Sequence, residues 1–266
     1  MEIIAKISKG TKMDQIYIPK IREGLEIGSY VIIKKIEEKE TQSEIKKTFF
    51  YGLKSIEQIK LDIINKIFLL INKYIKKCDN IIITGSFLEA YFKFNDVDII
   101  LITDDKVNEK LLNKSIKSKI GIKSHIIAIS NKDLQIGLST DPLYTLMLSK
   151  CISMKRLIYK SKRKINYKLL DLHLLKSEPL IHSFDITNGN EKYYLTRNLI
   201  AINLFIEDKK ITKELVDKEI KSVFNLESIG NIKDNLLDKK KFLSIYQEKY
   251  KETQNKIFNL AKNDAK

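Results

Sequence analysis

The sequence is poor in the residues that mark several protein classes. It has two cysteines, Cys78 and Cys151, too few for a disulfide framework or a cysteine zinc site, and this fits a reducing compartment. Three prolines and nine glycines leave little material for flexible linkers. The longest apolar runs, near 67–71 and 99–102, are far shorter than a membrane span. The first residues show no signal-peptide pattern, so we expect a cytoplasmic protein with no membrane partner.

Acidic residues are also in deficit. The 266 residues include 49 Lys and Arg against 34 Asp and Glu, a formal net charge of +15. This excess favours a polyanionic partner such as a nucleic acid, a nucleotide or an acidic protein; a lysine-rich proteome is the alternative explanation.

The positive charge is concentrated in residues 150–168. This stretch has eight cations and no acidic residue, with Tyr159 and Tyr167 between them. A solvated helix face normally mixes both signs, so we expect an anion-binding surface here rather than a plain exposed face. The candidate contacts to phosphates or to an RNA acceptor are Lys155, Arg156, Lys162 and Arg163, together with Arg197 from a later helix.

The pattern of apolar residues predicts an α+β protein with three domains: a β domain over 1–40, a mixed sheet flanked by helices over 50–165, and a helical domain over 166–266. In the middle domain a helix over 55–76 precedes a strand at 81–84, with Lys60 expected on its polar face. A strand at 97–103, a helix near 106–117 capped by Asp104-Asp105, a strand at 120–130 and a helix from Pro142 follow. Helices are expected at 169–176, 191–207, 212–223 and 239–265.

Residues 1–37 alternate like short strands at 3–7, 15–18 and 30–36, with a one-turn helix expected at Pro19. This order resembles the AbrB/SpoVT-like swapped-hairpin domain. Many members bind DNA, and most form intertwined dimers. Through Glu40 the segment has eight basic and seven acidic residues, so the resemblance implies a homodimerisation module more than a DNA-binding one. A plain β-hairpin is the alternative.

The most informative stretch is 81–103, in which an apolar run ends at Gly85-Ser86 and a second begins at Asp96-Val97-Asp98. Alternation along a strand places both aspartates on one face, where two carboxylates can share Mg²⁺ or Mn²⁺. Gly85 lets the backbone approach a phosphate closely. Ser86 can donate its hydroxyl and main-chain N–H at the start of the helix expected to follow.

This arrangement resembles the polymerase-β-type nucleotidyltransferase superfamily over residues 55–155. Its signature is an apolar strand, Gly-Ser, nine to thirteen residues, and Asp-x-Asp before a second apolar run. The resemblance implies a mixed sheet, Gly85 and Ser86 as the nucleotide-binding pair, and Asp96 and Asp98 as metal-binding catalytic residues. It further implies metal-dependent transfer of a nucleoside monophosphate from an NTP to an RNA, protein or small-molecule acceptor.

The sequence departs from the family at one place. Many members carry a third carboxylate on a later strand, but the strand near 120–130 has no acid. His125 is a candidate third ligand or base, although a lone histidine in a strand is more often a structural residue. Weaker candidates for the third carboxylate are Glu89, Asp133 and Asp141. The alternative function is therefore a weakly catalytic protein of the same fold that binds nucleotide or nucleic acid, as a dimeric regulator or a toxin–antitoxin component.

Overall fold

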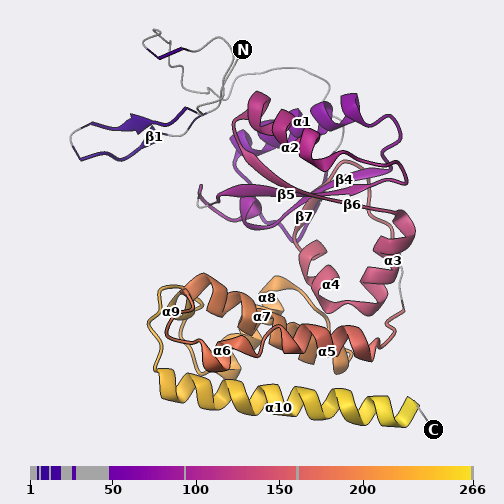
Figure 1. The fold of residues 1–266 in the computed structure, drawn as a ribbon, viewed down its shortest axis with the longest axis vertical. Coiled ribbons are helices and arrows are strands. Elements are labelled where there is room, and N and C mark those ends of the chain that lie inside the picture. Colours follow the sequence, from indigo (N-terminus) through magenta and orange to yellow (C-terminus); the bar gives the residue numbers. More distant parts are fainter. Residues whose placement is uncertain are drawn as a thin grey trace. The chain divides into compact units, whose positions relative to one another are not determined.

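The computed structural model describes Ala5 and residues 7–11, 13–18, 26–27, 48–92, 94–159 and 162–264 (Figure 1). The chain divides into two compact units. The first comprises Met1–Leu134 and Lys150–Ile158, and the second comprises Gln135–Ser149 and Tyr159–Lys266. The predicted α+β class, with a mixed sheet flanked by helices, is confirmed.

The N-terminal hairpin pairs β1 (Ile7–Ser8) with β2 (Gln15–Ile16) in antiparallel fashion. The helix expected at Pro19 and the strand expected at 30–36 lie outside the described residues. The AbrB/SpoVT-like domain and the dimer through residues 1–37 therefore stay predictions.

The five-stranded sheet of the first unit has the order β3-β7-β4-β5-β6. Its strands are β3 (Phe49–Tyr51), β4 (Asn80–Thr84), β5 (Asp96–Ile102), β6 (Lys123–Ile129) and β7 (Cys151–Ser153). The β5–β6 pair is parallel and the other pairs are antiparallel. Three-residue strands are too short to show an alternating pattern, so β3 and β7 were not predicted. The helix that begins at Pro142 ends at Leu148, and Ile152 lies in β7.

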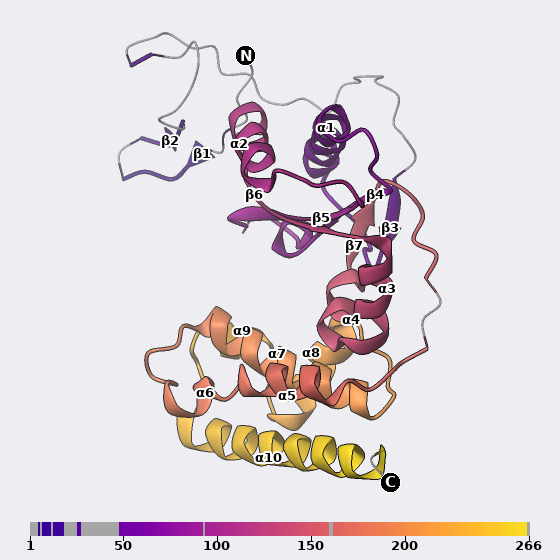
Figure 2. The same ribbon diagram turned by 45° about the vertical axis from the view of Figure 1, so that its right-hand side comes forward.

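Two helices, α1 (Gln58–Tyr74) and α2 (Glu109–Ile120), cover one face of this sheet (Figures 1 and 2). Alternate strand residues such as Ile81, Ile83 and Ile99 pack with them in one buried cluster. Helix α2 begins later than predicted because its N-cap is Asn108, whose side chain accepts a hydrogen bond from the Leu111 N–H. The expectation that Asp104-Asp105 caps this helix was wrong.

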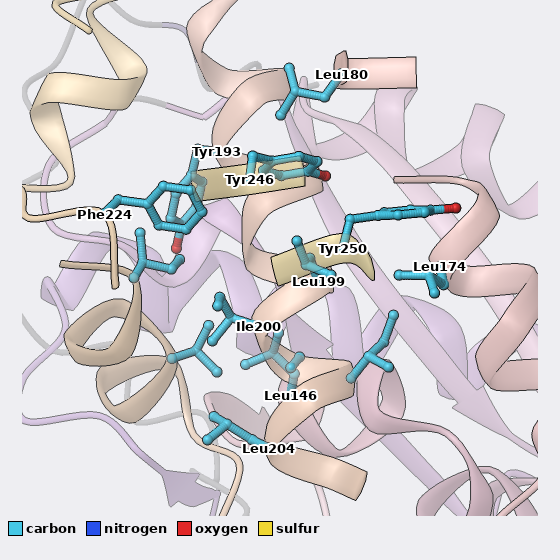
Figure 3. Packing of buried hydrophobic residues seen from close by; sticks show 14 of the residues in the cluster. Leu146, Leu174, Leu180, Tyr193, Leu199, Ile200, Leu204, Phe224, Tyr246 and Tyr250 are labelled. Carbon is cyan, nitrogen blue, oxygen red and sulfur yellow. The ribbon is translucent and has the colours of Figure 1, made fainter. Parts of the chain in front are cut away.

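Helix α3 (Asn131–Thr140) follows β6, and α4 (Pro142–Leu148) begins directly after Asp141, which caps it. The other helices of the second unit are α5 (Tyr167–Leu175), α6 (Pro179–His182), α7 (Gly189–Ile206), α8 (Lys213–Val223), α9 (Gly230–Lys233) and α10 (Lys239–Asp264). Their apolar side chains form one cluster around α7, with Leu199 and Ile200 fully buried (Figure 3). Of the helices in the described part of the chain, none has the length and apolar composition needed to cross a bilayer.

Candidate functional site

The two aspartates lie on the sheet face opposite α1 and α2. Val97 and Ile99 point into the core shared with these helices, and strand alternation turns Asp96 and Asp98 the other way. Both carboxylates lie at the beginning of β5, where the strand leaves the surface and enters the core. The face that α1 and α2 leave uncovered thus carries a pair of acidic side chains at one edge.

Asp98 is held between two neighbours. In the sheet register it lies opposite Thr84, the last residue of β4, and beside His125 of the parallel strand β6. Its Oδ1 is 3.5 Å from Nδ1 of His125. Its Oδ2 lies against the Gly85 backbone, where an added Cβ would be only 1.9 Å away. Gly85, Asp98 and His125 therefore form one contiguous row.

The charge on Asp98 is costly in this position. Burial raises the pKa of its carboxyl group, the charge of Asp96 raises it further, and the contact with His125 acts in the opposite direction. A divalent cation shared by Asp96 and Asp98 would offset both costs, and carboxylate oxygens are ligands that Mg²⁺ and Mn²⁺ accept. The residues present therefore fit a metal, with two carboxylates from the chain.

Gly85 has a backbone conformation that other residues do not adopt. Its φ of 82° and ψ of −161° fall in a region accessible to glycine almost alone. The next three residues, Ser86–Leu88, form a single 3-10 turn rather than the expected helix. A turn this short has no substantial dipole, so the expectation that Ser86 binds a phosphate at the start of a helix was wrong. The exposed Ser86 hydroxyl remains beside Gly85 as a donor.

A buried lysine supports the segment after this turn. Lys60 of α1, expected on the polar face of the helix, has a fully buried side chain, so that expectation was wrong. It lies on the same row as Ile64 and Ile67, four and seven residues later, and this spacing is the sequence signal that pointed inward. Its ammonium group contacts the backbone of Glu89 and Tyr91, which precede Asp96 in the chain.

The expected substitutes for a third carboxylate have other partners. Glu89 forms an ion pair with Lys150 at 3.1 Å. Asp133 accepts a hydrogen bond from the Ser130 hydroxyl at the start of α3. Asp141, in the second unit, caps α4 and contacts Nε2 of His173 at 3.0 Å. Within the described ranges, no three His, Cys, Asp or Glu side chains gather as a metal site.

The basic candidates of the first unit lie away from this edge or are exposed. The backbone of Lys155 is hydrogen-bonded to Asn80, the first residue of β4, whereas Gly85 follows the last residue of this strand and lies about 16 Å further along it. The Lys155 ammonium donates to the carbonyl of Cys78. Arg156 is exposed to solvent.

The remaining basic candidates belong to the second unit. Lys162 is exposed, whereas Arg163 pairs with Asp208 at 3.0 Å and donates to the carbonyls of Phe205 and Lys209 at the end of α7. Arg163 therefore caps a helix, as cations commonly do at this end. Arg197 stacks on the Tyr194 ring at 4.4 Å, and its buried Nε has no hydrogen-bond partner among the described residues.

Two contacts, Gly85 with Asp98 and Asp98 with His125, together with the supporting lysine, describe a site whose parts come from the end of β4, from β5 and β6, and from α1. The chain was also compared with protein-family models, curated proteins and solved structures. None of the three comparisons found a match.

Proposed function

We propose that this chain transfers a nucleoside monophosphate from an NTP to an acceptor, in a reaction that depends on Mg²⁺ or Mn²⁺. The observation that carries the proposal is the placement of the Asp98 carboxylate. It lies against the backbone of Gly85 and shares its face of β5 with Asp96. A carboxylate pair at the start of a buried strand, next to a glycine turn and the exposed Ser86, suits a metal-bound triphosphate, and it agrees with the resemblance to polymerase-β-type nucleotidyltransferases.

In this proposal Asp96 and Asp98 hold the cation. When bound, the cation neutralises charge on the phosphates and lowers the pKa of the acceptor hydroxyl. The missing side chain of Gly85 leaves room for the Asp98 carboxylate beside its backbone, and Ser86 donates its hydroxyl to the phosphates. The acceptor oxygen forms a bond to the α-phosphorus, the bond to the leaving pyrophosphate breaks, and the acceptor proton passes to a base or to solvent.

His125 takes the position beside Asp98 in the sheet, on the strand where many superfamily members have their third carboxylate. Because its ring nitrogen is 3.5 Å from Asp98, it is close enough to act as a ligand or as the base after a small side-chain rotation. The acceptor is an RNA, a protein or a small molecule. The exposed cations Arg156 and Lys162 are candidate contacts for a polyanionic acceptor.

The test is transfer of label from NTPs radiolabelled at the α-phosphate to a panel of RNA, protein and small-molecule acceptors. We expect transfer with Mg²⁺ or Mn²⁺, and none in Asp96→Asn/Asp98→Asn. The matched control is Asp104→Asn/Asp105→Asn, which removes two exposed carboxylates just beyond the other end of β5. Equal transfer by both double variants would refute the proposed role of the site.

A second candidate function is nucleotide or nucleic-acid binding without turnover. It is favoured by one observation: in β6, the residues facing Asp96 and Asp98 in register are Lys123 and His125, and neither is acidic. Binding of NTP or RNA that does not depend on Mg²⁺, without transfer to any acceptor, would favour this alternative. A dimeric regulator would behave in this way, whereas a toxin–antitoxin component that modifies a partner protein would share the transfer chemistry and differ only in its acceptor.

A further inference from the structure

Among the described residues of the first unit, Lys60 is a fully buried cation, and two of its polar contacts are to the segment that follows the Gly85-Ser86 turn. Its side chain has no exposed surface. The rings of Phe87, Phe92 and Phe94 lie 5.2–6.0 Å from its ammonium nitrogen. An ammonium group in such surroundings must use its three donors, since each unsatisfied one is costly.

The three donors have three acceptors. Lys60 Nζ donates to the backbone carbonyls of Glu89 and Tyr91, and it is 3.0 Å from the carboxylate of Glu57 just before α1. The other oxygen of Glu57 accepts the Tyr91 N–H at 2.8 Å. Burial raises the pKa of Glu57, but its contacts with Lys60 and Tyr91 outweigh this, so the net pKa is lowered and the carboxylate stays charged.

These contacts hold a segment that has no regular structure of its own. The described residues 89–92 form neither helix nor strand, and Tyr91 has a left-handed φ of 67°. A lysine and a glutamate fix both backbone groups of Tyr91, which apolar packing alone would not do.

The path from Lys60 to the site is short. The Glu89 carbonyl accepts from Lys60, while the Glu89 N–H donates to the carbonyl of Ser86 at 3.0 Å. The Glu89 side chain is held by Lys150, whose carbonyl accepts the Thr84 hydroxyl. The turn that follows Gly85 is thus anchored from α1 on one side and from the start of β7 on the other.

We infer that Lys60 and Glu57 are positioning residues that set the place of the Gly85-Ser86 turn relative to Asp98. This inference rests on the proposed function for its consequence, which is tighter binding of the metal–nucleotide. The clamp itself, defined as the Lys60–Glu57 pair with its bonds to Glu89 and Tyr91, is independent of any ligand.

The experiment compares Lys60→Met with Ile71→Ala. Ile71 is fully buried on the same helix, about 16 Å from Lys60, so its truncation destabilises the same core without touching the clamp. Glu57→Gln is the second variant. Glu57 is partly exposed, and the substitution keeps an acceptor for Tyr91, so the protein should fold even if Lys60→Met does not.

Two quantities are measured. The first is amide hydrogen exchange at Glu89 and Tyr91 without nucleotide, which we expect to be at least about ten-fold faster in Lys60→Met than in Ile71→Ala. The second is the Kd for an Mg²⁺-bound NTP analogue with a methylene between the α- and β-phosphorus. We expect Lys60→Met to weaken it about ten-fold or more, Glu57→Gln to weaken it less, and Ile71→Ala to leave it unchanged.

Equal exchange at Glu89 and Tyr91 in Lys60→Met and Ile71→Ala would overturn the clamp. Faster exchange with an unchanged Kd would overturn the positioning role. If the wild-type chain binds no nucleotide, the proposed function and the positioning role fail together, while the exchange rates still decide whether Lys60 holds the segment.

Discussion

Replacing Gly85 with alanine is expected to disrupt the candidate site and to destabilise the protein through two separate effects. The backbone has φ 82° and ψ −161°, a conformation that costs an L-residue about 1–3 kcal/mol. The added Cβ would also lie 1.9 Å from Oδ2 and 2.9 Å from Cγ of Asp98. Asp98 is fixed by its sheet pairing, so its side chain must rotate away, at a further cost of about 1 kcal/mol.

The total expected loss in the free energy of unfolding is therefore about 2–4 kcal/mol. Gly121→Ala is the matched control. Gly121 ends α2 in the left-handed region with φ 80°, and a Cβ there meets no described atom beyond its chain neighbours within 4 Å. This variant should lose about 1–2 kcal/mol and keep nucleotide binding intact.

Urea unfolding and titration with the Mg²⁺-bound NTP analogue measure the two effects. We expect Gly85→Ala to weaken the Kd at least about ten-fold. When Asp98 is also replaced by alanine, Gly85→Ala should lower the free energy of unfolding only by the backbone strain, because the carboxylate that the added Cβ would meet is absent. If Gly85→Ala binds the analogue as tightly as the wild type, or is no less stable than Gly121→Ala, then Gly85 does not have the role assigned to it here.

Three further changes test individual contacts. The pKa of Asp98 is raised in the folded protein, so its ionisation lowers the free energy of unfolding as pH rises from about 3.8 to the folded-state pKa. Asp98→Asn should therefore have a Tm at pH 7 in EDTA that is no lower than that of the wild type. A clear fall in Tm would contradict this. Hydrogen bonds from Lys209 and Lys256 lower the pKa of Glu207 to about 2, so their stabilisation is present above pH 4.5 and is lost as pH falls from 4.5 towards 2. Lys256→Met should cost about 1 kcal/mol at pH 7 and less at pH 2.5, and a loss independent of pH in urea unfolding would argue against the pair. Asn108→Ala should cost about 1 kcal/mol because α2 loses its cap, whereas Asn108→Asp should cost little; equal stability of the two by urea unfolding would count against the cap.

Long periodic segments could be predicted from the sequence. The apolar stripe of α1, the buried runs of β4 and β5, and the C-terminal helices all have enough residues for their period to show. The alternation Asp96-Val97-Asp98 predicted that both carboxylates share one face, and β5 has them so. The first residue of a helix was harder to predict, because several residues before α2 can act as a cap. The helix begins after Asn108, which caps it, and not after the aspartates that precede it.

Contacts that depend on pairing between distant segments could not be predicted. The parallel register that brings His125 beside Asp98 is set by the packing of the whole sheet, and the sequence of β6 alone does not contain it. The burial of Lys60 depends on Glu57 and on two carbonyls about thirty residues later in the chain. Arg163 looked like a surface cation in a basic run, but the carbonyls at the end of α7 bind it.

Calorimetric binding of the Mg²⁺-bound NTP analogue tests the role of Asp96 and Asp98 without requiring an acceptor. We expect the wild type and Asp104→Asn/Asp105→Asn to bind the analogue equally, and Asp96→Asn/Asp98→Asn not to bind it. If binding survives the loss of Asp96 and Asp98, or if the wild type does not bind the analogue, these carboxylates do not form a metal–nucleotide site.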